Sequence, residues 1–139
     1  MATPVLTRAG MRRLAEVACG TVGAIPFQKM RLYVNDVYPG IDMKLTDLVE
    51  CTLAGYVQQF PNGAAAVITD DINQCLVTYP PVTFTFNAYA GPQVVIHGWY
   101  LCDSIASNLT GMRYFEPGIA IPLAGSTMVI TLELPVRGG

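Results

Sequence analysis

Glycine and proline punctuate this chain, and their placement constrains the fold more than any other feature of the sequence. They cluster at Pro39 and Gly40, at Pro80 and Pro81, and at several later positions. Both residues interrupt regular structure, so only short elements fit between them. The runs between them are rich in β-branched and aromatic residues, with alternating apolar and polar positions. This pattern predicts a mainly β fold, a small antiparallel sandwich or barrel that is jelly-roll-like.

The expected strands are the runs in which apolar residues alternate or continue over five to eight positions. They are residues 30–34, 64–69, 74–79, 82–87, 94–101 and 128–134. Alternation gives each strand one buried face, and the continuous apolar run at 94–101 is typical of a central strand. Residues 45–54 remain ambiguous between a strand and a short helix that begins at Thr46.

One helix is expected, over residues 7–19. Its apolar positions follow helical spacing, namely Met11, Leu14, Ala15 and Ala18. Thr7 is a suitable N-cap and Gly20 a suitable C-terminal stop, whereas Gly10 weakens the helix interior. We therefore divide the chain into an N-terminal arm and helix, residues 1–24, and a β domain, residues 25–139.

Charged residues make up only 13% of the 139-residue chain, whereas hydrophobic residues make up 52%. An ordinary soluble domain carries about 25% charged residues. So few charges exclude a disordered chain and predict a surface that is largely covered by other proteins. No apolar run is long enough for a membrane span, and the N-terminus lacks the apolar stretch of a signal peptide. The chain is therefore expected to fold in a cytosol and not to contact a membrane.

The few charges are unevenly distributed. Residues 1–31 carry five Lys and Arg against one acid (5 − 1 = +4), and residues 32–139 carry three against nine (3 − 9 = −6). A basic head and an acidic body predict head-to-body contacts between copies, or docking on an acidic surface. The alternative is a solvated basic helix. Without a further basic patch, nucleic acid is not an expected partner.

No group of residues in the sequence has the spacing of a catalytic, cofactor or metal site. The single histidine, His97, lies within an expected strand, and the cysteines at 19, 51, 75 and 102 are far apart. They are expected to be reduced and mostly buried, although a disulfide framework in an oxidising compartment is the alternative. Asp36, Asp42 and Asp47 lack calcium-loop spacing and fit turns or helix caps better. Neither an enzyme nor a cofactor is predicted.

The order of short motifs resembles a known class of proteins. The motifs are KMRLYVN at 29–35, LTDL at 45–48, GY at 55–56, TFTF at 83–86, VIHGWY at 95–100 and YFEP at 114–117, followed by a last strand at 125–134. This order is similar to that of short β-rich virion proteins of tailed bacteriophages, over roughly residues 29–134. The resemblance implies a non-enzymatic structural protein of the virion, assembled in the host cytoplasm.

Within that class, a capsid decoration protein is the expected role. Such a protein binds the phage head by repeated contacts with the major capsid protein or other virion subunits, and a homo-oligomer is expected. The predicted interface residues are Arg8, Arg12 and Arg13 for electrostatic contacts, and Tyr33, Trp99 and Tyr100 as anchors. The alternative is a tail-fibre or spike domain that binds a host receptor or glycan.

Overall fold

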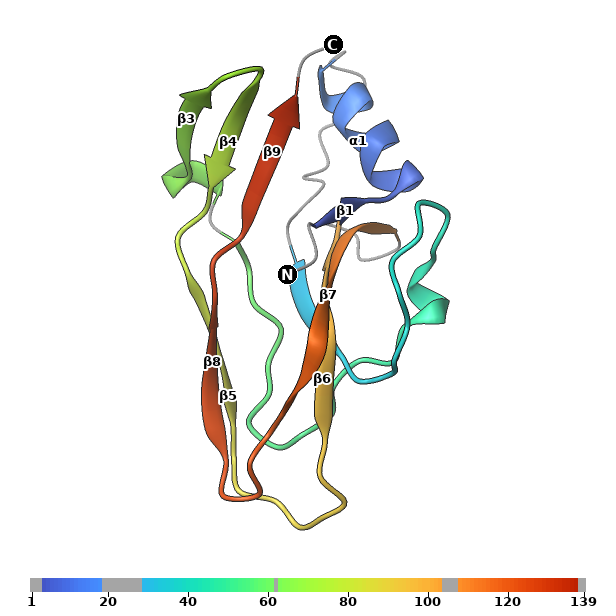
Figure 1. Ribbon diagram of the computed structural model, residues 1–139, viewed down its shortest axis with the longest axis vertical. Coiled ribbons are helices and arrows are strands. Elements are labelled where there is room, and N and C mark those ends of the chain that lie inside the picture. The colour runs from blue at the N-terminus through green and yellow to red at the C-terminus, as the bar shows by residue number, and fades with distance from the viewer. Residues whose placement is uncertain (1–3, 19–28, 62, 104–107, 138–139) are drawn as a thin grey trace.

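The computed structural model describes residues 4–18, 29–61, 63–103 and 108–137. The protein is mainly β, with three antiparallel sheets and one α-helix in the described part of the chain (Figure 1). The fold class expected from the sequence is therefore confirmed at the level of a small, antiparallel, β-sandwich-like fold. None of the described helices is long and apolar enough to cross a membrane.

The first layer is a four-stranded sheet in the order β1-β7-β6-β2. Its strands are β1 (Val5–Leu6), β7 (Leu109–Ala120), β6 (Val95–Cys102) and β2 (Lys29–Tyr33). The expected strands at 30–34 and 94–101 correspond to β2 and β6. The ambiguous residues 45–54 contain a single 3-10 turn, Leu45–Asp47, and then extended chain that touches the sheet edge through a bridge between Glu50 and Tyr33.

The second layer is a long, kinked ribbon. β5 (Val82–Phe86) pairs with β8 (Ser126–Ile130), and β4 (Gln74–Thr78) pairs with both β9 (Glu133–Arg137) and β3 (Val67–Asp71). Thr78 pairs with Glu133 and Val82 pairs with Ile130. Between these two pairs, the segment from β4 to β5 has three residues, and the segment from β8 to β9 has two. The segment from β4 to β5 thus has one extra residue, and it contains Pro80 and Pro81, which cannot donate ladder hydrogen bonds. Regular pairing is therefore interrupted here, and the expected strand 128–134 is divided into β8 and β9.

Two apolar clusters stabilise the fold. The larger lies between the layers and consists of Met30, Leu32, Cys51, Phe84, Phe86, Ile96, Trp99, Leu101, Phe115, Ile121, Ile130 and Leu132. The smaller lies on the outer face of the four-stranded sheet, under the segment that contains the 3-10 turn, and consists of Tyr33, Leu48, Tyr100, Cys102, Leu109 and Met112. Both faces of β6 are therefore buried, as its continuous apolar sequence predicts.

β7 is the longest strand, and the sequence did not predict it because it contains Gly111, Pro117 and Gly118. The register explains how these residues are accommodated. Gly98 pairs with Tyr114 and Ile96 with Ile119, so four residues of β7 face the single residue His97 of β6. Pro117 and Gly118 lie in this bulge, where no regular ladder hydrogen bond is required.

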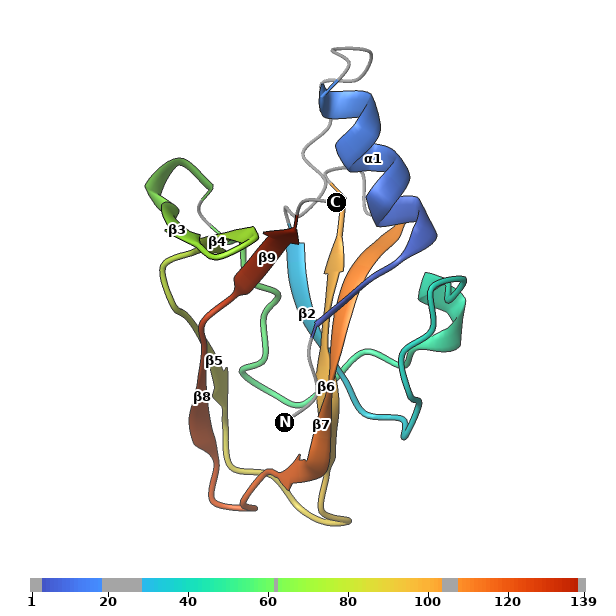
Figure 2. The same cartoon turned by 45° about the horizontal axis from the view of Figure 1, so that its top comes forward.

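The helix α1 (Arg8–Ala18) packs against β7, and β1 pairs with β7 at Gly111 and Met112 (Figure 2). The expected N-cap is confirmed, because the Thr7 hydroxyl accepts a hydrogen bond from the Gly10 amide at 3.1 Å. Gly20, the expected stop, lies outside the described residues. The described part of the N-terminal arm is thus built into the sheet of its own chain.

Candidate interaction surface

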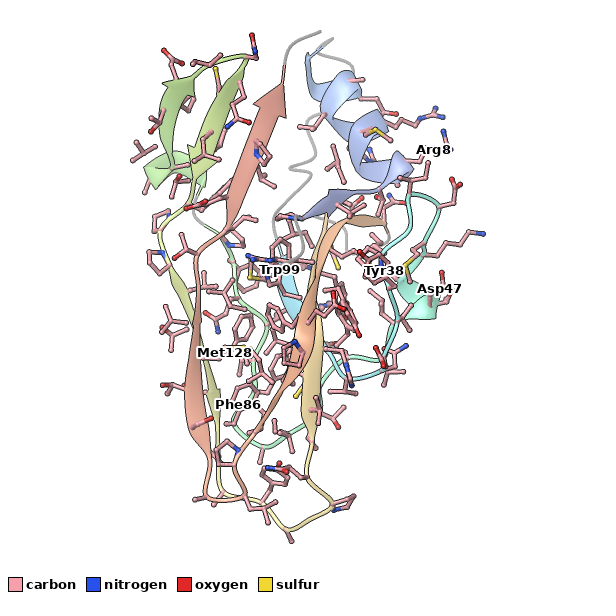
Figure 3. All side chains as sticks on the ribbon, viewed as in Figure 1. Arg8, Tyr38, Asp47, Phe86, Trp99 and Met128 are labelled. Carbon is pink, nitrogen blue, oxygen red and sulfur yellow. The ribbon has the colours of Figure 1, made fainter. Side chains whose placement is uncertain are left out.

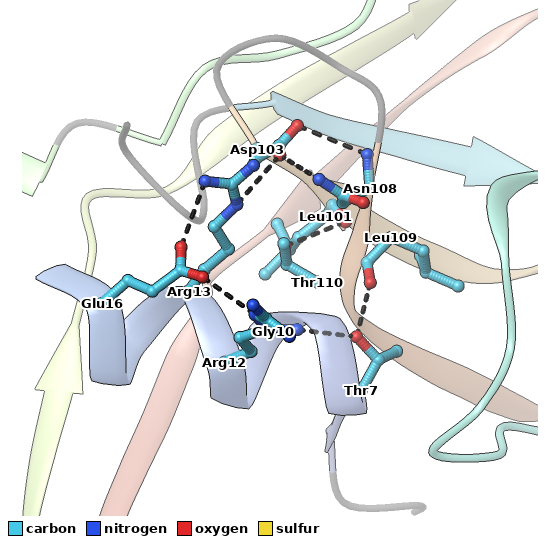
Figure 4. Close-up of polar contacts among 10 residues, drawn as sticks. All are labelled: Thr7, Gly10, Arg12, Arg13, Glu16, Leu101, Asp103, Asn108, Leu109 and Thr110. Carbon is cyan, nitrogen blue, oxygen red and sulfur yellow. Dashed lines mark hydrogen bonds and ion pairs between the residues drawn. The ribbon is translucent and has the colours of Figure 1, made fainter. Parts of the chain in front are cut away.

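The three arginines of the predicted interface all lie on α1, and each has an acidic partner within the chain. Figure 4 shows the partners of Arg12 and Arg13. Arg8 Nε lies 2.7 Å from Asp42 Oδ1, and Arg12 Nε lies 2.9 Å from Glu16 Oε1. The Arg8 guanidinium holds the pKa of Asp42 below its usual value by hydrogen bonding and by its charge. Both side chains of the Arg8 pair are well exposed, so the pair contributes little to stability.

Arg13 is the least exposed of the three, and its side chain is 21% exposed. Its guanidinium lies 3.3 Å from Glu16 Oε2 and 3.6 Å from Asp103 Oδ2, measured from Nη1 and Nε respectively. The Asp103 carboxylate is fully buried and also accepts a 2.7 Å hydrogen bond from the side-chain amide of Asn108. Part of the positive charge of the N-terminal region is therefore neutralised within the same chain, because Arg8 and Arg13 pair with acidic residues of the β domain.

The three predicted aromatic anchors lie in the interior. Tyr33, Trp99 and Tyr100 are 0%, 1% and 3% exposed. Trp99 belongs to the core between the layers, and the two tyrosines belong to the outer cluster, where their rings are 6.3 Å apart. Burial raises the pKa of Tyr100 to about 12. These side chains offer no surface to a partner, so an interface on this molecule has to use other residues.

The two most exposed large apolar side chains among the described residues, Ile72 and Ile68, lie on the hairpin formed by β3 and β4, and Val67 lies next to Ile68. Val67, Ile68 and Ile72 are 61%, 68% and 85% exposed. The hairpin extends from the upper end of the ribbon, beside β9 (Figure 1). Its tight turn places Asn73 at a φ of 63°, a left-handed conformation that asparagine tolerates. We call residues 67–78 the projecting hairpin.

Sequence reasoning located the strands of the projecting hairpin but not its exposure. The consecutive Val67 and Ile68 resemble a buried strand, and only the register shows that β3 is an edge strand paired with β4 alone among the described residues. A signal was nevertheless present. Residues 64–80 contain two acids and no Lys or Arg, so this apolar segment lacks the lysines that commonly protect an edge strand.

The remaining polar candidates are dispersed. His97 Nδ1 lies 3.7 Å from Asp36 Oδ1, which accepts a 2.6 Å hydrogen bond from the Tyr114 hydroxyl. The Asp47 carboxylate accepts the Lys44 amide at 2.8 Å and so stabilises a turn. In the ranges that the structure describes, no three His, Cys, Asp or Glu side chains gather as a metal site would require.

Three cysteines are free thiols: Cys51 and Cys102 are buried, and Cys75 is exposed on β4. Cys19 lies outside the described residues. Burial raises the pKa of Cys102 to about 11 and raises that of Cys51, whereas a hydrogen bond to Asp70 raises that of Cys75. The two buried thiols are members of the apolar clusters and behave as small hydrophobic side chains.

This burial predicts the order of thiol modification in the native protein. With Cys19 replaced by serine, iodoacetamide should label Cys75 and leave Cys51 and Cys102 unlabelled until the protein unfolds, because the buried thiols are inaccessible and poorly ionised. Peptide mass spectrometry at successive times, with and without denaturant, measures the order. Labelling of Cys102 at the same rate as Cys75 under native conditions would contradict the burial of the outer cluster.

No family model, curated protein or solved structure matches this chain.

Proposed function

We propose that the protein is a non-enzymatic structural subunit of a virus particle, a capsid decoration protein of the tailed-bacteriophage type. It works by repeated contacts with further copies of itself and with the capsid. The observation that carries this proposal is the projecting hairpin, which exposes Val67, Ile68 and Ile72 to solvent at or beside the edge strand β3. Exposed apolar groups that gather on one element are typical of an interaction site. The motif order and the low charge of the chain support the same role.

The partner surface for the hairpin is the outer face of α1 on a second copy. This face exposes Met11 and Leu14, 43% and 38% exposed, next to the 82% exposed side chain of Arg12. The hairpin presents apolar side chains next to the exposed Asp70 and carries no cation. Each surface thus combines apolar groups with a charge opposite to that of the other, and such complementarity selects partners.

The two surfaces lie at the same end of the molecule, on opposite sides of β9 (Figure 1). A contact between the hairpin of one copy and α1 of the next is therefore lateral and joins two different surfaces. Contacts of this kind generate closed rings or extended arrays, not isolated symmetric dimers. A layer of such subunits suits the covering of a particle, because many modest contacts that act together reinforce one another.

Replacing Ile72 with aspartate should abolish self-association. The wild-type protein is expected to show, as its concentration increases, a mass above the 15.0 kDa of one chain in size-exclusion chromatography with light scattering. The Ile72→Asp variant should remain monomeric and folded, because the side chain it alters is 85% exposed. The matched control is Val57→Asp, which places the same charge at a 62% exposed valine outside both surfaces and should associate as the wild type does.

A charge exchange tests the pairing of the two surfaces. Arg12→Glu and Asp70→Lys should each weaken association, because each variant places like charges at every contact. An equimolar mixture of the two single variants should recover association, because every contact between unlike variants joins opposite charges. The double variant restores opposite charges at every contact and should associate again. A wild-type protein that remains a monomer at every concentration, or a double variant weaker than both single ones, would contradict the proposed assembly.

A further inference from the structure

A pocket opens between the two layers, on the side where β7 and β8 face each other. It has a volume of about 590 Å³ and lies within the range of small-molecule sites. It exists because both of its bordering strands are edges there. β1 pairs with β7 only at Gly111 and Met112, and β8 pairs only with β5 in the described part of the chain.

The walls of the pocket are mostly apolar. β7 contributes Phe115, Pro117 and Ile119, and β8 contributes Met128, Val129 and Ile130. Trp99 and Met128 lie between the two layers (Figure 3). An apolar wall of this extent fits the hydrocarbon or aromatic body of a ligand and not a sugar, whose hydroxyl groups would require many hydrogen-bonding partners.

Two buried nitrogen donors belong to residues that line the pocket beside this apolar wall. Trp99 and Arg113 are direct cross-strand partners on β6 and β7, so their side chains lie on the same face of the sheet. Trp99 is 1% exposed. The Trp99 Nε1 and Arg113 Nε atoms are both buried, and neither finds a hydrogen-bond acceptor among the described residues. A buried donor without an acceptor is costly, and it is rare in native proteins.

Both groups are donors, and one of them carries a positive charge. Glu116, the acidic residue of the lining, forms no ion pair with Arg113 within the described ranges and is exposed. An indole N–H next to a guanidinium fits an oxygen anion, since a carboxylate accepts several hydrogen bonds and compensates the charge. We propose that this pocket binds a small amphipathic carboxylate, with its carboxylate at Trp99 and Arg113 and its apolar body against β7 and β8.

The chain offers a direct readout of this site, because Trp99 is its only tryptophan. One indole N–H signal is therefore expected in the proton–nitrogen correlation spectrum, and it belongs to the proposed donor. Decanoate should shift this signal in a saturable titration. Decanol and decylamine, with the same chain length, should bind at least about tenfold more weakly, because a hydrogen bond to a charged group accounts for a difference of that size.

Variants of Arg113 test the charge requirement. Arg113→Gln should weaken decanoate binding by about 10- to 100-fold and leave decanol binding unchanged, whereas Arg113→Lys should retain part of the selectivity. The matched control is Lys44→Gln, which removes a positive charge from an exposed residue outside the pocket and outside both proposed assembly surfaces, and should bind decanoate as the wild type does. An indole signal that does not move, equal affinity of the wild type for decanoate and decanol, or unchanged decanoate affinity in Arg113→Gln would overturn the proposal. The comparison of decanoate with decanol uses the wild-type protein alone, so it tests the proposal even if the Arg113 variants do not fold.

Discussion

Replacing Gly10 with alanine should destabilise the protein, although the same substitution in an exposed helix interior is favourable by about 1 kcal/mol. A Cβ atom built on Gly10 would overlap the carbonyl oxygen of Thr110 on β7 and lie 2.8 Å from its carbonyl carbon. Both obstructing atoms belong to the backbone, which cannot move aside as a flexible side chain can. We expect a net loss of about 1–3 kcal/mol, the usual cost of an overpacked interior.

Equilibrium denaturation followed by circular dichroism measures this loss. The control is Ala15→Gly on the exposed part of α1, which should cost about 1 kcal/mol through helix propensity alone. The two substitutions are opposite in direction and should nevertheless both destabilise the protein. A Gly10→Ala variant more stable than the wild type would show that α1 does not pack on β7 through this residue.

Gly10 also shows what the sequence can and cannot indicate. From the sequence it is only a weak position in an otherwise regular helix, because helical spacing says nothing of the surface on which the helix lies. In the structure it is a position where α1 and β7 approach each other closely. The N-cap at Thr7 was predictable because its partner is three residues away. The Thr110 contact was not, because it joins residues 100 positions apart.

The same distinction applies to the strands. The runs that became β2, β4, β5 and β6 were predictable because alternation is local and each lies between turn residues. β7 was not, because Pro117 is compatible with a strand only where a bulge relieves it of pairing, and the bulge is a property of two strands together. Without β7, the cross-strand pair of Trp99 and Arg113 could not be inferred. The candidate pocket was therefore not predictable from the sequence.

The six predicted interface residues also differ in burial, and the sequence alone could not show which of them are buried. A tyrosine or tryptophan suits a half-buried interface and a core equally well, and composition does not distinguish the two. Tyr33 and Tyr100 lie in the outer cluster because the segment containing the 3-10 turn Leu45–Asp47 covers that face of the sheet. The three arginines of α1 also differ in their exposure. Arg13 is the least exposed because it faces the Asp103 carboxylate, and the position of Asp103 is known only from the fold.

Replacing Asp103 with alanine should destabilise the protein more than any other change at a charged residue considered for this chain. The carboxylate is fully buried, and its loss leaves Asn108 without its 2.7 Å acceptor and Arg13 with Glu16 as its remaining acidic partner. Breaking a buried charged pair by removing one partner costs about 3–5 kcal/mol. Asp103→Asn should cost less, because the amide oxygen still accepts a hydrogen bond although the charge is lost.

A double-mutant cycle separates the ion pair from the rest of this network. Arg13→Gln alone should cost less than Asp103→Ala, because the arginine is partly exposed and the buried carboxylate retains Asn108. The coupling between the two positions is expected at about 0.5–3 kcal/mol, whereas Asp42→Ala, which breaks the exposed pair with Arg8, should change the free energy of unfolding little. Additive effects of Arg13→Gln and Asp103→Ala would mean that the two residues stabilise α1 and β7 independently. A measured coupling would identify their ion pair as the link that fixes α1 to the β domain. The face of α1 that is proposed for assembly would then be held in place by this pair.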